Sequence, residues 1–277
     1  MNQTASSIKL LKIIKNLCQV SDNLPMFDMS GAIEIICNLL WKPNEVVDIR
    51  TQVFSCLFYS LRLNSRRQER ALRMGILKHL ALSCSSNHPA KQFAVPILCD
   101  IVCHLTTETF WQENMLDILI KLLQDFCWRS VVLEAILSWI SKEPSRVEDA
   151  LLTSTKPVFQ TIFLNPTPRY ETENQIMSQL VRILSQNPKI GYLLLSDGIV
   201  LYLSRIGMIP SQQLTIDMLK IFFNLVRPNF NSYWKEHVKD YNLAMLTISK
   251  MQINNSVLVK QMVNNILEQL NKLRSSY

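Results

Sequence analysis

A short phrase recurs along this chain at intervals of about forty residues, each time where a polar stretch ends and an apolar stretch begins. Its copies are Gly31-Ala32-Ile33, Gly75-Ile76-Leu77, Asn114-Met115-Leu116, Gly198-Ile199-Val200 and Asn242-Leu243-Ala244. Their first positions, 31, 75, 114, 198 and 242, lie 44, 39, 84 and 44 residues apart, and the gap of 84 holds two units of 42 with one marker lost. A steady unit of this size made of helices is typical of a solenoid and not of a globular enzyme. We therefore expect a protein that functions as a binding surface.

The residue content favours helix along the whole chain. The 277 residues include 5 glycines, and Leu, Ile, Lys, Gln and Asn recur in helically spaced runs, whereas alternating strand patterns are hard to find. We predict an all-α fold, an armadillo-like right-handed solenoid of about six helical repeats that forms one domain over residues 1–277. Prolines interrupt the pattern in region 143–172. An insertion within one solenoid and a hinge near 153–172 are both open there, and the return of similar helices afterwards favours the insertion.

Several individual helices follow from the apolar spacing. Segments 6–18 and 31–40 and a longer segment from 46 to 64 carry apolar residues every three or four positions, which predicts helices. Gly75 suits a left-handed helix cap. Pro96 falls inside an apolar helical run, where its ring meets the carbonyl of Gln92, so we expect either a kink or a helix whose first turn begins near Pro96.

The chain shows no sequence sign of a membrane span or a secretory leader. Stretches without Asp, Glu, Lys or Arg are no longer than 79–90 and 157–168, short of the roughly 20 apolar residues of a span, and residues 1–7 are polar. The seven cysteines, at 18, 37, 56, 84, 99, 103 and 127, are an odd number without a CxxC pair. We expect reduced thiols that pack in the core of a soluble cytoplasmic protein.

The motifs of an enzyme are missing from the sequence. The glycines, at 31, 75, 191, 198 and 207, form neither GxGxxG nor GxxxxGK, and the chain has no His-Arg-Asp or Asp-Phe-Gly. We therefore expect no catalytic residue, no kinase activity and no cofactor in this chain. Cys99, Asp100, Cys103 and His104 form two adjacent rows on a helix and suggest a metal site, but no second ligand pair follows and the cysteines interleave with apolar residues, so core packing is favoured.

One local concentration of charge stands out against a formal net charge of +7 that is otherwise spread evenly. Between residues 62 and 78 the sequence has six basic residues and a single acid, Glu69. Guanidinium groups bind carboxylates and phosphates in a bidentate manner, so this cluster predicts a contact with an acidic partner, although it could instead only solvate an outer helix. Nearby aromatic residues could anchor the partner or belong to the core. The candidate partner-binding residues are Arg62, Arg66, Arg67, Arg70, Arg73, Lys78, Trp111, Trp128 and Arg129, with no metal ligand among them.

Several short segments of the sequence resemble one protein family. They are the runs 67–76 (RQERALRMGI), 91–100 (KQFAVPILCD), 111–114 (WQEN) and 146–152 (RVEDALL), together with Trp128 and 137–140 (LSWI). They are similar to the armadillo-like non-catalytic region of the septation-initiation and mitotic-exit network kinases of fungi, which is shared with the plant epsilon-class MAP kinase kinase kinases. The resemblance is strong from about residue 8 to 152, and residues 153–277 continue as divergent repeats.

The resemblance implies a regulatory module of a serine/threonine kinase whose catalytic domain lies elsewhere. Such a module is expected to bind an activating Ras-like GTPase in its GTP state, or a spindle pole body scaffold, and to be recruited from the cytoplasm to the pole. Self-association is the alternative, either through a terminal helix from about 256 to 273 or through an exposed stripe elsewhere in the divergent second half. Nucleic-acid binding is not expected, because the chain lacks a basic tail and interleaved aromatic residues.

Overall fold

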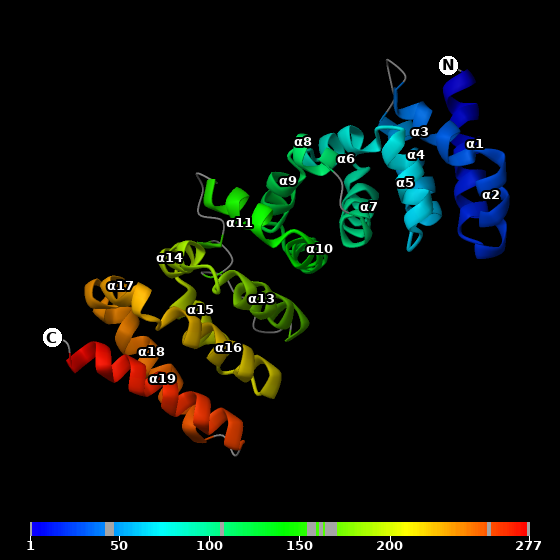
Figure 1. Cartoon of the computed structure of the whole chain (residues 1–277). Helices are drawn as coiled ribbons and strands as arrows, with labels where there is room; N and C mark the ends of the chain where they lie inside the picture. Colours follow the sequence, from blue (N-terminus) through cyan, green and yellow to red (C-terminus); the bar gives the residue numbers. More distant parts are fainter. Residues whose placement is uncertain are drawn as a thin grey trace. The chain divides into compact units, whose positions relative to one another are not determined.

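The computed structural model describes residues 2–41, 47–105, 108–153, 159–160, 163, 171–253 and 256–275. These residues form helices joined by short turns, and no strand occurs among them. They group into two compact units, residues 1–142 and 143–277. Figure 1 labels the helices along the chain. The prediction of an all-α fold is confirmed.

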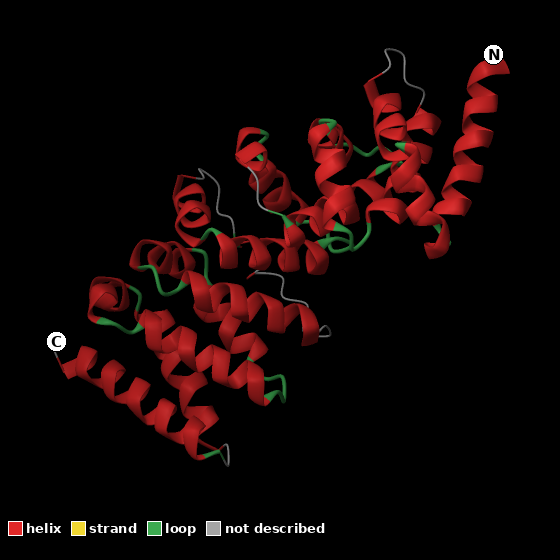
Figure 2. Ribbon diagram, turned by 45° about the vertical axis from the view of Figure 1, so that its right-hand side comes forward, coloured by secondary structure: helices red, strands yellow, loops and turns green. Residues whose placement is uncertain are grey.

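The first unit consists of one long helix followed by three triplets of helices. The long helix is α1 (Asn2–Cys18). The triplets are α2 (Leu24–Ser30), α3 (Ala32–Asn38) and α4 (Val47–Leu61); α5 (Ser65–Arg73), α6 (Ile76–Ser85) and α7 (Lys91–His104); and α8 (Glu108–Gln112), α9 (Met115–Leu122) and α10 (Arg129–Lys142). Two 3-10 turns, η1 (Ser21–Asn23) and η2 (Leu39–Trp41), complete the unit. Helix α1 and the last helix of each triplet pack one on the next and form a ladder: α1 packs on α4, α4 on α7 and α7 on α10 (Figure 2).

The second unit repeats this plan. Its helices are α11 (Pro144–Thr153) and α13 (Glu171–Leu184); α14 (Pro188–Ser196), α15 (Ile199–Ile206) and α16 (Gln212–Leu225); and α17 (Asn231–Glu236), α18 (Val238–Lys250) and α19 (Val257–Ser275), with 3-10 turns η3 (Pro228–Phe230) and η4 (Met251–Ile253). Here the ladder is α13, α16 and α19. Within the described residues, the triplets of the two units agree with the predicted armadillo-like repeats.

The recurring phrase marks the junction between the first and second helix of a triplet. Gly31, Gly75, Asn114 and Gly198 have φ angles of 67°, 76°, 52° and 91°, in the left-handed region that ends one helix and starts the next. The fifth copy was interpreted wrongly, because Asn242 lies inside α18, and the junction before that helix is His237 with φ −112°. The marker missing from the gap of 84 falls near 156, outside the described residues.

Pro96 lies well inside α7, which begins at Lys91. The alternative of a helix that starts near Pro96 is therefore wrong. Because proline has no N–H, the carbonyl of Gln92 loses its usual partner in the helix. The kink remains a prediction.

Five of the seven cysteines are buried, as the sequence indicated, whereas Cys103 is half-buried and Cys127 is exposed. All seven cysteines are free, and burial raises the pKa of Cys18 to about 11 and those of Cys37, Cys56 and Cys84 to about 12. In the described part of the chain no single helix is long and apolar enough to cross a membrane, although the bent pair 21–30 and 32–41, which meet at 76°, has the required length and composition together.

Candidate interaction surface

The basic cluster is built around helix α5, and its sequence explains where that helix begins and ends. Asn64 has an extended backbone and its side-chain Oδ1 accepts a hydrogen bond of 3.0 Å from the N–H of Arg67, which caps the first turn. The helix ends just before Gly75, whose left-handed conformation turns the chain into α6. The helix thus presents four arginines over two turns.

Arg67 points into the protein and not towards solvent. Its Nε and Nη2 donate to the two carboxylate oxygens of Asp28 at 2.9 and 2.8 Å, and its Nη1 donates to the carbonyl of Ser60 at 3.3 Å. The residue is only 8% exposed. This bidentate pair ties α5 to α2 of the preceding triplet.

Arg70 makes a second pair of the same kind on the same side of α5. Its Nε and Nη2 each donate to the carboxylate of Glu34 at 2.7 Å, and its Nη1 lies 3.4 Å from Asp28 Oδ1. The hydrogen bonds from these arginines hold the pKa of Asp28 and the pKa of Glu34 below their ordinary values, and the bonds to Glu34 raise the pKa of Arg70. The acids lie 39 and 36 residues before their arginines, about one repeat earlier.

The other basic residues of the cluster remain at the surface. Arg62, Arg66, Arg73 and Lys78 are exposed. Arg62 lies near the ring of Phe58, with its guanidinium carbon 6.0 Å from the ring centre, and the Nζ of Lys78 lies 3.8 Å from Glu113. These four side chains are the part of the cluster that a partner could reach.

Arg129 and the two tryptophans all belong to the third triplet. Trp111 lies in α8, Trp128 directly precedes α10, and Arg129 is the first residue of α10. Arg129 is 1% exposed, its Nε donates to the carbonyl of Leu123 at 2.9 Å and its guanidinium covers the ring of Phe126 at 4.1 Å. Trp111 is half-buried and its ring lies 4.7 Å from that of Trp139, while Trp128 is half-buried just before α10. Arg67, Arg70 and Arg129 therefore have partners within the chain, and the role of all the candidate residues in partner binding remains a prediction.

Asp100 belongs to the group of residues that suggested a metal site in the sequence, but in the structure its carboxylate binds other parts of the chain. Its Oδ2 accepts hydrogen bonds from Gln68 Nε2 at 2.7 Å and from the backbone N–H of Leu63 at 3.1 Å. Leu63 has a φ of 54°, so the carboxylate fixes a strained turn between α4 and α5. Among the described residues, no three His, Cys, Asp or Glu side chains come together as a possible metal site.

A hollow on the ladder of the first unit was not foreseen from the sequence. It measures about 260 Å³ and is lined by residues from α4, α7 and α10. Phe58, Pro96 and Val131 supply apolar walls, and Arg62 and Glu134 supply opposite charges. Several lining residues stood out in the sequence for other reasons, namely Arg62, Pro96, Cys99, Asp100 and Cys103, but their spacing did not indicate a hollow.

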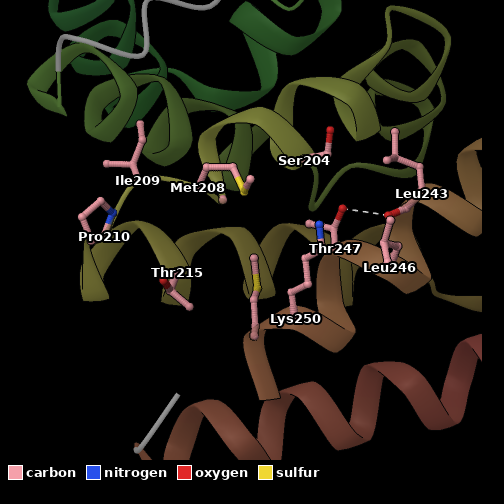
Figure 3. Close-up of a pocket in the computed structure, with 11 residues that line it drawn as sticks. Ser204, Met208, Ile209, Pro210, Thr215, Leu243, Leu246, Thr247 and Lys250 are labelled. Carbon is pink, nitrogen blue, oxygen red and sulfur yellow. Dashed lines mark hydrogen bonds between the residues drawn. The ribbon is translucent and has the colours of Figure 1, made fainter. Parts of the chain in front are cut away.

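A larger hollow of about 460 Å³ lies in the second unit, between the end of α15, the start of α16 and α18 (Figure 3). Its rim carries the exposed apolar side chains of Met208 and Leu246, which are 74% and 55% exposed. Lys250 also lines it, and Thr247 donates a hydrogen bond of 2.7 Å to the carbonyl of Leu243 in its wall. Among these residues, only Leu243 belongs to a pattern noted in the sequence, the recurring phrase at 242–244.

Comparison with known proteins gives the chain its relatives. No protein-family model matches it. It is 30% identical to cytokinesis protein sepH of Aspergillus niger over 67% of this chain and 15% of that protein, and 30% identical to MAP3K epsilon protein kinase 1 of Brassica napus over 69% and 15%. Cell division control protein 7 of Schizosaccharomyces pombe is 22% identical over 94% of this chain and 25% of that protein.

These matches relate the chain to a region of the fungal septation and plant MAP3K epsilon proteins, as the short segments of the sequence indicated. The match covers about 15% of the length of the first relatives. The match to the fission-yeast protein covers too much of the chain to stop at residue 152, so the relationship continues into the second half.

Solved structures confirm the class of repeat. A designed armadillo repeat protein is similar with a TM-score of 0.57 at 13% identity, over 86% of this chain and 99% of that chain. An engineered protein is similar with a TM-score of 0.56 at 11% identity, over 95% and 74%. At these identities the likeness concerns the fold alone, and that fold is armadillo-like.

Proposed function

We propose that this chain is the non-catalytic interaction and localisation module of a protein kinase that acts in septation or mitotic exit. Its relatives carry the names of a cytokinesis protein, a cell division control protein and a protein kinase, and each aligns with this chain over a small part of its own length. Stacked helices with an extended surface suit the binding of proteins. The catalytic domain would then lie in another part of the polypeptide.

The proposed partner is an activating Ras-like GTPase in its GTP state, or a spindle pole body scaffold that recruits the module from the cytoplasm to the pole. The observation that carries the proposal is the different surroundings of the four arginines on α5. Arg67 and Arg70 are held by the chain's own acids, while Arg66 and Arg73 of the same helix stay exposed. With Arg62 and Lys78 they offer a positive surface that suits acidic groups on a partner.

Self-association through the last helix has less support. After its first turn, the exposed residues along α19 are polar, namely Lys260, Gln261, Asn264, Asn265, Glu268, Asn271 and Lys272. A polar outer face offers little apolar area for a dimer.

Binding of the full chain to the Ras-like GTPase of its own septation pathway tests the proposal. Calorimetry should show tighter binding to the GTPase loaded with a GTP analogue than with GDP. The double variant Arg66→Glu/Arg73→Glu should weaken that binding by about tenfold or more, because rim charges on both sides of the contact become alike. Equal binding of the two nucleotide forms would contradict the proposal.

The control variant is Lys121→Glu/Lys220→Glu, which reverses two exposed charges on α9 and α16. It changes the net charge by the same amount and should leave binding unchanged. Circular dichroism should show the same helicity for all variants. If both double variants weakened binding equally, net charge and not the α5 surface would be responsible.

A further inference from the structure

Helix α1 exposes an apolar stripe on the side that faces away from its neighbour. Leu10, Ile13 and Leu17 recur at spacings of three and four, and they are 57%, 57% and 45% exposed. A neighbouring side of the helix packs on α4, where Leu11 and Cys18 are each 2% exposed and the Cys56 thiol lies 3.2 Å from the carbonyl of Leu11. The helix is therefore apolar on two sides, although only one of them is covered.

Helix α19 of the second unit offers a comparison within the same chain. It buries Val259, Val263 and Ile266 on one side, and after its first turn, where Val257 and Leu258 are exposed, its outer side carries amide and charged side chains. The uncovered stripe of α1 is apolar over two turns instead, and exposed contiguous apolar residues mark sites of interaction.

The charges on α1 indicate the chemistry of what covers it. Residues 1–21 contain three lysines, at 9, 12 and 15, and no Asp or Glu. Lys9 and Lys12 are exposed and lie on one flank of the apolar stripe. A ligand with apolar side chains in a row and acidic groups beside them would complement both features at once.

We propose that the outer face of α1 binds an acidic amphipathic helix of a partner protein. The bound helix would lie against Leu10, Ile13 and Leu17 as α1 itself lies against α4, and would add one rung to the ladder of the first unit. Its carboxylates would face Lys9 and Lys12. This surface is separate from the arginines of the proposed function and does not depend on them.

Two other occupants fit the face less well. A second copy of this chain would place the lysines of two α1 helices against each other, which is repulsive. A membrane surface usually binds helices with a wide apolar face that includes Trp or Phe, whereas this stripe is one side chain wide and contains no aromatic residue. A helix in a groove matches the narrow stripe better.

Fluorescence anisotropy with labelled designed peptides tests the proposal on the full chain. The probe is an amphipathic helix of roughly 18 residues, long enough to be helical when bound, with leucines at i, i+3, i+4 and i+7 and glutamates beside them. Its companion carries lysine in place of every glutamate. We expect saturable binding of the acidic peptide and none of the basic one.

Variants then locate the site. Leu10→Gln/Ile13→Gln should weaken binding of the acidic peptide by about tenfold, since two side chains lose their burial. Lys9→Glu/Lys12→Glu should weaken it as well and should allow the basic peptide to bind. The matched control is Leu82→Gln on α6, which changes an exposed leucine, 61% exposed, elsewhere in the same unit and should have no effect.

The remaining outcomes overturn the proposal. No binding of the acidic peptide, or binding that survives both α1 variants, removes the site. Co-sedimentation with phosphatidylserine vesicles that is lost in Leu10→Gln/Ile13→Gln would assign the face to membranes. A dimer in sedimentation velocity that the same variant dissolves would assign it to a second copy of the chain.

Discussion

At the scale of single residues, position on one short helix decides what an arginine does. Arg67 and Arg70 lie three residues apart and share the inner side of α5, where Asp28 and Glu34 receive them. Arg66 and Arg73 lie seven residues apart and share the outer side. The density of charge was visible in the sequence, whereas the acids were not recognised as partners because they lie one repeat earlier. An acid placed one repeat before an inward arginine is a signal that could have found them.

The Asp28 pair should contribute measurably to stability. Removing Arg67 leaves a partly buried carboxylate without its bidentate partner, so Arg67→Ala should lower the free energy of unfolding by about 2–3 kcal/mol. Arg66→Ala, one position away on the exposed side, should change it by less than about 0.5 kcal/mol. Urea unfolding followed by circular dichroism measures both. Equal losses would mean that the pair on Asp28 adds nothing.

The same pair predicts how stability depends on pH. The pKa of Asp28 and that of Glu34 are lowered in the folded chain, so their contribution is complete above the ordinary carboxyl pKa values of 3.8 and 4.5 and is lost as the pH falls through the lowered values. Arg67→Ala removes the contribution of Asp28 and leaves the pair of Arg70 with Glu34 in place, so below about pH 3.8 stability should fall less steeply in Arg67→Ala than in the natural chain. Parallel pH profiles would contradict this account.

At the scale of the helices and turns, much of the fold follows from a few residues with special backbone requirements. Gly31, Gly75, Asn114 and Gly198 mark four junctions because a left-handed φ is costly for most other residues. Asn242 carries the same phrase without marking a junction, because asparagine is also tolerated within a helix. Helix boundaries near Pro96 were also uncertain from sequence, since the packing of α7 against α4 and α10 outweighs the cost of an internal proline.

Two of these glycines form a matched pair for a stability test. A Cβ at Gly75 would lie 2.9 Å from Trp41 Cζ2, whereas a Cβ at Gly198 would meet no atom within 4 Å. Both substitutions to alanine place a side chain at positive φ, at a cost of about 1–2 kcal/mol. Gly75→Ala should cost about 1 kcal/mol more, because the ring of Trp41 must move and its hydrogen bond to the Met74 carbonyl is strained. Urea unfolding compares them, and a smaller loss for Gly75→Ala would contradict the role of Trp41.

At the scale of the whole molecule, the repeat sets the spacing of the polar links as well as of the apolar core. Asn187 donates to Glu148 39 residues earlier, Asn224 to Ser185 39 residues earlier, and the amide of Phe159 to Asp197 38 residues later. Such links join each repeat to its neighbour, which is how a solenoid gains stability. The period was readable from the sequence, but the pairs were not, because their identity depends on which turn of each helix meets the next.

The extent of the folding domain decides how the chain unfolds. We proposed one domain over residues 1–277, and the structure groups the chain into units 1–142 and 143–277, each with its own ladder of helices. Each unit has the size of an ordinary domain, so we expect both fragments, expressed separately, to be helical and to unfold cooperatively in urea. In the full chain, one domain predicts a single transition that Arg67→Ala shifts as a whole. Two transitions, of which Arg67→Ala shifts only the one seen in fragment 1–142, would instead establish two domains, because a stability defect in one would then leave the other untouched.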